Sequence, residues 1–386
     1  MTSYSLGKLR KNKKRRIIVI SAGGPQSGIQ CIYFSASGTW EVIANTMMHY
    51  PQKVASLIEK LSSGISDQFK PSDFAWLDYK ISQLMVECVK TTLAQVPRSM
   101  STPHVAVLNK LSIWKGPTGE NFQQQHWDVT VGDAQFVAST LGIPVFTDFV
   151  RNNILAGGPG NLPVNLGNLA IASKCPGLVA FINIGLVSHM TIIDTATSIH
   201  IIDSSTGPGT SLIDKITKEI SVNDNFDRDG SLASQGKVDG ETLNTLVSSP
   251  WFLKNAPKYA SPDQFDELLE DTTFKMLEPY DRLATITALT ARSLYNFFRS
   301  EYKGLIIPEK IYISGGGANN LTLVEFLSAY FQPIVIKNIE ELGIPADMRI
   351  PLALGLTVNS YLTGTSVPWE TGSNPRIAEI GRWIFP

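Results

Sequence analysis

Four short segments rich in glycine have the residue types that bind phosphate groups. The first spans residues 21–28, between two apolar runs, and the others are 183–185, 206–209 and 315–317. Glycine has no Cβ, so the backbone N–H groups of such segments can approach phosphate oxygens closely, and a helix that follows adds the positive end of its dipole. We therefore predict a nucleotide cradle whose candidate residues are Gly23, Gly24, Gly28, Asn183, Gly185, Thr206, Gly207, Gly209, Gly315, Gly316, Gly317 and Asn320.

The alternative interpretation of each segment is a tight turn at the junction of a strand and a helix, which is a common use of glycine. Four such segments, each beside a predicted strand, favour phosphate binding over four unrelated turns. The chain has neither a Walker A sequence nor a GxGxxG fingerprint, so the P-loop and Rossmann classes lose their strongest support.

The apolar pattern predicts strands and helices in alternation that would hold these segments. Strands are expected at 17–20, 29–34, 105–108, 143–149, 178–184, 190–193, 200–203 and 310–313, and helices near 54–61, 81–93, 132–141, 166–173, 281–301 and after residues 209 and 318. Because the strand, glycine turn and strand of 17–34 recur at 178–193, we predict an α/β chain of two duplicated domains that close over a cleft. The domains are placed at 17–168 and 169–386, and the final helix is left free to pack on the first domain.

The composition describes a folded chain of about two domains. The 386 residues exceed what one hydrophobic core usually organises, and 43% hydrophobic against 17% charged residues lies outside the disordered range. No apolar run is long enough to predict a membrane span or a secretory signal. The three cysteines, Cys31, Cys88 and Cys175, form no CxxC pair, so we expect reduced structural thiols and no zinc site.

A basic segment precedes the first predicted strand. Residues 1–16 hold seven of the 33 basic residues and no acidic residue, which leaves 26 basic against 34 acidic residues in the rest of the chain. We interpret the segment as a disordered, solvated tail, and a nuclear address or a phosphate-binding arm is the alternative. The mildly acidic body gives no specific nucleic-acid signal. We expect a cytoplasmic protein without membrane contact, and nuclear import through the basic segment stays open.

Ordered motifs from residue 17 to the end of the chain resemble the anhydro-sugar kinase family, which includes anhydro-N-acetylmuramic acid kinases and fungal levoglucosan kinases. The matching segments are 132–133, 147–149, 157–158, 183–185, 206–209 with Asp214, 226–230, 236–238, 249–252 and 314–320. The resemblance implies the two-domain fold of actin, Hsp70 and hexokinase, with a central interdomain cleft. It also implies ATP with Mg²⁺, and phosphorylation of a 1,6-anhydro sugar with water-assisted opening of its bridge. Its sugar contacts map to Trp114, Asp133 and Asp148, and it leaves a homodimer open.

The chain departs from the family where the chemistry needs acids. The family's first loop reads Ser-Gly-Thr-Ser-x-Asp-Gly-x-Asp, and its two aspartates fall on Ser27 and Gln30. Mg²⁺ prefers oxygen ligands and is helped by negative ones, so metal binding at these two residues is doubtful. The family's general base, an aspartate, falls on Asn153. A neutral amide accepts no proton at pH 7, and loss of a general base typically costs about 10² to 10⁴ in rate.

Further departures include one in the family's sugar-site segment. The family segment His-Gly-Gln-Thr is replaced by residues 109–112, which read Asn-Lys-Leu-Ser, an aspartate falls on Ser205, and a late glutamate falls on Ile350. Surviving candidates for a metal or water ligand are Asp133, Asp148, Asp203 and Asp214. Asp203 lies two residues before Ser205 on a predicted strand, so the two side chains are expected to share a face.

Two functions therefore compete. The first is a pseudokinase that keeps a nucleotide and lacks catalysis, and we favour it because the substitutions affect metal, base and sugar contacts together. The alternative is an active carbohydrate kinase of anhydro-sugar or amino-sugar catabolism that uses the surviving aspartates.

Overall fold

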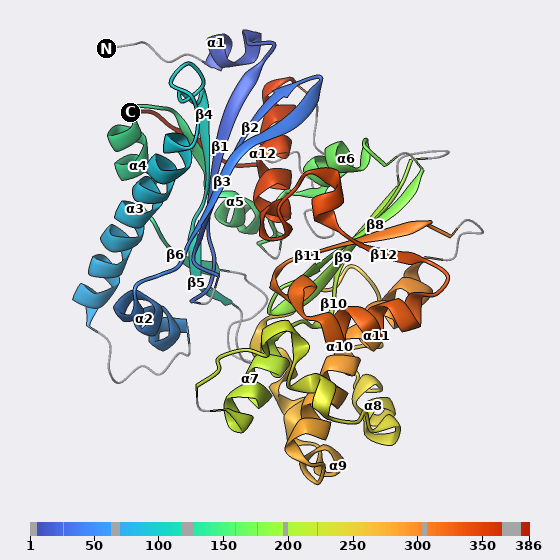
Figure 1. Ribbon diagram of the computed structural model, residues 1–386. Helices are drawn as coiled ribbons and strands as arrows, with labels where there is room; N and C mark the ends of the chain where they lie inside the picture. Colours follow the sequence, from blue (N-terminus) through green and yellow to red (C-terminus); the bar gives the residue numbers. More distant parts are fainter. Residues whose placement is uncertain are drawn as a thin grey trace. The chain divides into compact units, whose positions relative to one another are not determined.

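The computed structural model describes residues 6–25, 27–62, 70–116, 127–158, 160–175, 177–195, 200–221, 223–302, 307–364 and 380–386. The chain divides into two compact units (Figure 1). The first unit comprises Met1–Ala170 and Ile350–Pro386, and the second comprises Ile171–Arg349. The division therefore falls two residues beyond the expected boundary at residue 168, and the final helix belongs to the first unit from Ile350 onward.

The first unit is built on a six-stranded sheet. Its strands lie in the order β13 (Arg382–Ile384), β7 (Val145–Thr147), β4 (Val105–Asn109), β1 (Arg15–Ala22), β2 (Ile29–Ser37) and β3 (Thr39–Met48). The strands β1, β2 and β3 form an antiparallel meander, whereas β4 and β7 run parallel to β1. The β1–β2 hairpin was expected from the glycine-rich segment between its two apolar runs.

The second unit repeats this arrangement in a five-stranded sheet. Its strands lie in the order β10 (His200–Pro208), β9 (Val187–Asp194), β8 (Leu178–Ile184), β11 (Lys310–Ser314) and β12 (Val335–Asn338). Again three strands form an antiparallel meander and two run parallel to its first strand. The predicted α/β class and the predicted duplication are therefore confirmed in the sheet topology.

Helices cover these sheets. In the first unit they are α2 (Gln52–Ser62), α3 (Pro71–Ala94), α4 (Ala134–Leu141), α5 (Phe149–Leu155), most of α6 (Asn165–Ala172) and nearly all of α12 (Arg349–Leu362), beside the small hairpin of β5 (Leu111–Gly116) and β6 (Trp127–Val131). In the second they include α7 (Ser211–Ile220), α8 (Gly240–Val247), α9 (Thr272–Lys275), α10 (Pro279–Glu301) and α11 (Leu321–Phe331). The described helices include none that is both long and apolar enough to cross a membrane.

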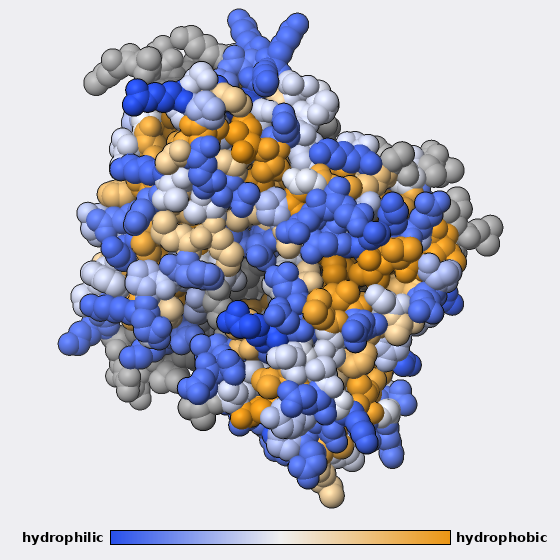
Figure 2. Space-filling view, viewed as in Figure 1, coloured by the Kyte–Doolittle hydropathy of each residue, from blue (hydrophilic) through white to orange (hydrophobic). Residues whose placement is uncertain are grey.

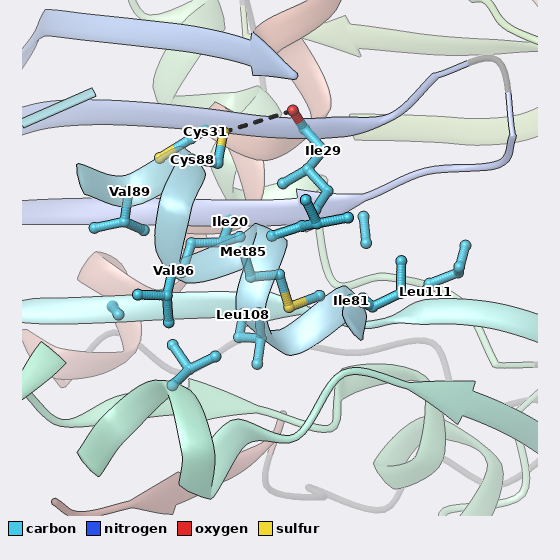
Figure 3. Packing of buried hydrophobic residues seen from close by; sticks show 14 of the residues in the cluster. Ile20, Ile29, Cys31, Ile81, Met85, Val86, Cys88, Val89, Leu108 and Leu111 are labelled. Atoms are coloured by element: carbon cyan, nitrogen blue, oxygen red, sulfur yellow. Dashed lines mark hydrogen bonds between the residues drawn. The ribbon is translucent and has the colours of Figure 1, made fainter. Parts of the chain in front are cut away.

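The core of the first unit lies between the sheet and α3. Ile81, Met85 and Cys88 recur at helical spacing and are completely buried against strand residues that include Ile29 (Figure 3). The Cys88 thiol lies 3.7 Å from the carbonyl oxygen of Ile29. All three cysteines are free thiols, and Cys31 beside Cys88 is buried, which raises its pKa well above the ordinary value.

The basic segment differs from the expected disordered tail. Leu6–Lys11 forms the short helix α1, and β1 begins at Arg15, two residues earlier than expected. The Arg15 guanidinium is buried and donates to the carbonyl oxygens of Leu9 and Arg10 near the end of α1. The surface over α1 is hydrophilic (Figure 2). Part of the basic segment is therefore an ordered element of the first unit.

Other differences concern the ends of elements. The strand expected at 143–149 is only Val145–Thr147, because Phe149 already opens α5. The turn expected at 206–209 is largely strand, since β10 continues to Pro208 across a register shift between Ser205 and Gly207. The strand β3 was not expected at all.

Candidate functional site

The glycine turn of the first unit closes the β1–β2 hairpin. The N–H of Gly23 donates to the carbonyl oxygen of Gly28 at 2.8 Å, and that of Ser27 donates to Gly24 at 3.0 Å. Gly28 has φ +65°, and a Cβ there would lie 2.2 Å from the carbonyl oxygen of Met48, so the turn itself requires this glycine. At Gly24 a Cβ would meet no atom within 4 Å, so packing does not explain that glycine.

The glycine segments of the second unit contact one another. The N–H groups of Gly209 and Thr210 donate to the carbonyl oxygens of Leu186 and Gly185 at 2.9 and 2.8 Å. A Cβ on Gly209 would lie 2.0 Å from the carbonyl oxygen of Gly185. The Thr206 hydroxyl is buried and donates to the carbonyl oxygen of Ser188 at 3.3 Å. Close backbone packing therefore accounts for Gly209, and this packing brings the 183–185 and 206–209 segments together.

The third segment, 315–317, approaches the same β8 turn. Cβ atoms on Gly315 and Gly317 would lie 2.6 Å from the carbonyl oxygen and 2.3 Å from the Cγ2 of Ile184. Gly316 is the exception, because a Cβ there meets nothing within 4 Å. Asn320 caps α11, its side-chain oxygen accepting from the N–H of Leu323 at 2.9 Å. The structure thus unites three of the predicted segments in the second unit and gives Asn320 a capping role.

Asn153, at the position of the family's general base, is completely buried on α5. Its side-chain oxygen accepts hydrogen bonds from the N–H groups of Gly160 and Asn161 at 2.6 and 3.0 Å. Its side-chain nitrogen has no partner among the described residues. The only acceptor of this side chain is therefore already used by the backbone of the loop that follows α5.

Asp148 lies in a small pocket of the first unit at the start of α5. Its carboxylate is 2.8 Å from the Lys110 ammonium and also pairs with the Arg382 guanidinium. Its backbone is left-handed, with φ 66°. The pocket is lined by Leu108, Asn109, Lys110, Asp128, Thr130, Asp148, Phe149, Val150 and Arg151. The charge of Asp148, which was expected to contact a sugar, is therefore neutralised by two basic side chains.

Replacement of Asp148 by Asn is expected to lower the free energy of unfolding by about 1 to 3 kcal/mol, because it leaves the half-buried Lys110 ammonium without its carboxylate. Asn tolerates the left-handed backbone, so strain adds little. In a double-mutant cycle measured by urea unfolding, Lys110→Met should restore part of this loss, with a coupling of about 1 kcal/mol. Additive effects of the two substitutions would contradict this prediction.

The other two expected sugar contacts lie elsewhere. Asp133 is exposed and caps α4, its carboxylate accepting from the N–H groups of Gln135 and Phe136 at 2.7 and 3.0 Å. Trp114 lies on β5, and its side chain is outside the described part of the chain. Among the described side chains that line the pocket of Asp148, Asp133 is not included.

The positions of the lost metal ligands carry no negative charge. Ser27 lies in the β1–β2 turn, and Gln30 lies on β2 opposite Ser21. Ser205, where the family has a further aspartate, is buried on β10 opposite His189. No group of three or more His, Cys, Asp or Glu side chains suited to a metal ion occurs among the described residues. Ser27 and Gln30 therefore supply no negative ligand at the two positions where the family resemblance implies a Mg²⁺ site.

Asp203 faces the same side of the second sheet as Ser205, as strand alternation predicts. Its carboxylate accepts from the Thr191 hydroxyl at 2.6 Å and lies 3.4 Å from Nδ1 of His189. Burial lowers the pKa of His189, although the Asp203 charge opposes this effect. Asp203 is therefore part of a polar network on its own sheet.

Asp214 lies in the first turn of α7 and is buried, and burial raises its pKa to about 7. The Thr210 hydroxyl donates to it at 3.2 Å. In the unfolded chain the group ionises near 3.8, so the folded state holds a proton that the unfolded state has lost between about pH 4 and 7. The free energy of unfolding that this proton contributes is fully present below about pH 4. It decreases as the pH rises and is lost once the pH has passed about 7.

We expect Asp214→Asn to remove this pH dependence. Urea unfolding at pH 5 and pH 8 should show that the wild-type protein loses roughly 2 kcal/mol more than the variant over that interval. Asp263→Asn, at an exposed position of the same unit, serves as the control and should follow the wild type. Parallel pH profiles for the wild type and Asp214→Asn would contradict the raised pKa.

Sequence reasoning missed the basic residues of these sites. Lys110 was noted only as part of a replaced segment, and Arg349 and Arg382 were not singled out. Nothing in the local pattern marks them, because their carboxylate or hydroxyl partners lie 35 or more residues away in the chain.

Two units that share one strand order, each with a glycine turn between its first two strands, define a two-domain fold of the actin-like class. The family model of anhydro-N-acetylmuramic acid kinase matches residues 15–377. The chain belongs to this family.

Relatives of the same description confirm the assignment. The anhydro-N-acetylmuramic acid kinase of Caldanaerobacter subterraneus is 31% identical over 256 residues, which cover 63% of this chain and 64% of that protein. That of Rhodopseudomonas palustris is 30% identical over 319 residues, which cover 76% of this chain and 84% of that protein. That of Salinibacter ruber is 22% identical over 383 residues, which cover 95% of this chain and 96% of that protein.

Similar solved structures include component A of (R)-2-hydroxyglutaryl-CoA dehydratase from Acidaminococcus fermentans. It is 11% identical with a TM-score of 0.44, over 90% of this chain and 99% of that chain. A ROK family protein from Streptococcus pneumoniae in complex with sucrose is 14% identical with a TM-score of 0.32, over 90% of this chain and 99% of that chain.

Proposed function

We propose that this chain is a non-catalytic member of the anhydro-N-acetylmuramic acid kinase family that binds a nucleotide in its second unit. The observation that carries the proposal is Asn153. A general base needs a free lone pair on a group that can be protonated near neutral pH. The amide of Asn153 has no such basicity, and its oxygen is held by two backbone N–H groups.

The surviving aspartates support the same conclusion, because each has a structural partner. Asp133 caps a helix, and Asp148 is paired with Lys110 and Arg382. Asp203 accepts from Thr191, and Asp214 is buried beside Thr210. An active carbohydrate kinase that used these aspartates would have to break such contacts. The pocket of Asp148 is the proposed sugar side, where Lys110 now competes with a sugar hydroxyl for the carboxylate.

Nucleotide binding is supported by the three glycine segments of the second unit. Backbone hydrogen bonds hold the 206–209 segment to the turn after β8, and the 315–317 segment, which directly follows β11, packs closely on Ile184 of β8. Gly316 has an ordinary backbone conformation and no neighbour within 4 Å of a Cβ, so its lack of a side chain leaves backbone open to a ligand.

Calorimetric titration of the full-length protein with ATP tests this proposal. The wild type should bind, and Gly316→Val should weaken binding at least about tenfold because the added side chain covers the open backbone. Gly240→Val is the matched control, since Gly240 also lacks neighbours within 4 Å and an unusual φ but starts α8. Absence of ATP binding by the wild type would overturn the proposal.

A further inference from the structure

A buried arginine lies beside the glycine segments of the second unit. Arg349 is only 1% exposed. Its Nε donates to the Ser314 hydroxyl at 2.9 Å, and its guanidinium carbon lies 5.9 Å from the centre of the Phe181 ring. Burial lowers its pKa to about 10, against the opposing charge of Asp203, so the side chain remains protonated at neutral pH.

Arg349 lies at the carboxyl ends of two parallel strands. Ser314, its partner, is the last residue of β11 and is in register with Asn183 of β8. The Ser314 hydroxyl also lies 3.3 Å from the side-chain oxygen of Asn183. Gly315 directly follows Ser314, and Gly185 comes two residues after Asn183. In open α/β sheets, ligands bind outside the carboxyl ends of the strands, which is where this guanidinium lies.

The acids near Arg349 do not suit a magnesium ion. Asp203 and Ser205 lie on one face of β10, and Ser205 has no charge. The Asp203 carboxylate already accepts a hydrogen bond from the Thr191 hydroxyl and lies beside His189. Among the described residues no cluster of metal-binding side chains is present. A divalent cation would also be repelled by a guanidinium that is held in the low dielectric of the protein interior.

We propose that the Arg349 guanidinium takes the place of Mg²⁺ and neutralises the phosphates of a nucleotide bound at Gly185 and Gly315–Gly317. The planar fork of a guanidinium matches phosphate oxygens in two parallel hydrogen bonds, so one arginine supplies both charge and orientation. The inference rests on the proposed nucleotide binding and adds that such binding needs no divalent cation.

The test is calorimetry of the full-length protein with ATP and with adenosine, in EDTA and in MgCl₂. We expect the ATP affinity of the wild type to differ by less than about threefold between the two buffers. Arg349→Met should weaken ATP at least about tenfold and leave adenosine unchanged, because adenosine has no phosphate. Arg299→Met, an exposed arginine of the same unit, is the control.

Removal of a buried charge can itself destabilise the protein, since Asp203 loses a countercharge. The double variant Arg349→Met/Asp203→Asn removes both charges, and thermal unfolding identifies the folded variants to be titrated. Strict dependence of the wild type on Mg²⁺, or unchanged or tighter ATP binding by a folded Arg349 variant, would overturn the inference alone. No ATP binding by the wild type in either buffer would overturn the proposed function as well.

Discussion

The purified protein, given ATP and Mg²⁺ with anhydro-N-acetylmuramic acid or levoglucosan, is expected to form no phosphosugar above background. We expect the rate to lie at least about 10⁴-fold below that of ordinary kinases, which turn over at about 1 to 100 s⁻¹. The physical reason is the combined loss of a base at Asn153 and of negative metal ligands at Ser27 and Gln30. Electrostatic stabilisation by a metal and proton removal from water are separate contributions to the rate, and the substitutions at these three positions affect both.

Mass spectrometry of the sugar product measures this directly and distinguishes phosphate transfer from simple ATP hydrolysis. An active family member assayed in parallel shows that the substrates and the detection are sound. Turnover by this chain at an ordinary kinase rate would disprove the assignment as a non-catalytic member and would favour the active carbohydrate kinase.

Simultaneous restoration of four acids is expected to have the second-largest effect. The variant Ser27→Asp, Gln30→Asp, Asn153→Asp and Ser205→Asp should gain phosphorylation of the sugar by at least about 10², whereas no single reversion should gain any. Catalytic groups that act as a unit are strongly non-additive, so one acid without the others has little to act on.

The geometry of Asn153 limits the gain expected from any variant that restores an aspartate at this position. An aspartate there would accept the N–H groups of Gly160 and Asn161, and hydrogen bonds to a carboxylate lower its pKa and weaken it as a base. The matched control is the triple variant that keeps Asn153, which isolates the contribution of the base. A quadruple variant that folds and binds ATP but stays inactive would indicate that Lys110, which pairs with Asp148, blocks the sugar side.

Local features of this protein could be predicted from its sequence. The apolar runs before and after residues 21–28 predict a hairpin because strand and turn preferences depend on adjacent residues. The helical spacing of Ile81, Met85 and Cys88 predicts the buried face of α3 for the same reason. The recurrence of a glycine turn between two strands predicted the duplication, which the order of the two sheets confirms.

The tertiary structure decided which charges meet. Lys110 and Asp148 are 38 residues apart, Arg382 joins them from the last strand, and Arg349 reaches Ser314 from 35 residues away. The capping role of Asp133 and the two backbone donors to Asn153 likewise depend on how the chain folds around them. Sequence by itself determined most of the strands and helices, the β1–β2 turn and the residue types at the family's acidic positions, since local residue type and spacing fix these. Only the fold decided what these residues and the surviving aspartates contact, because contacts between distant residues depend on register and packing that no local pattern encodes.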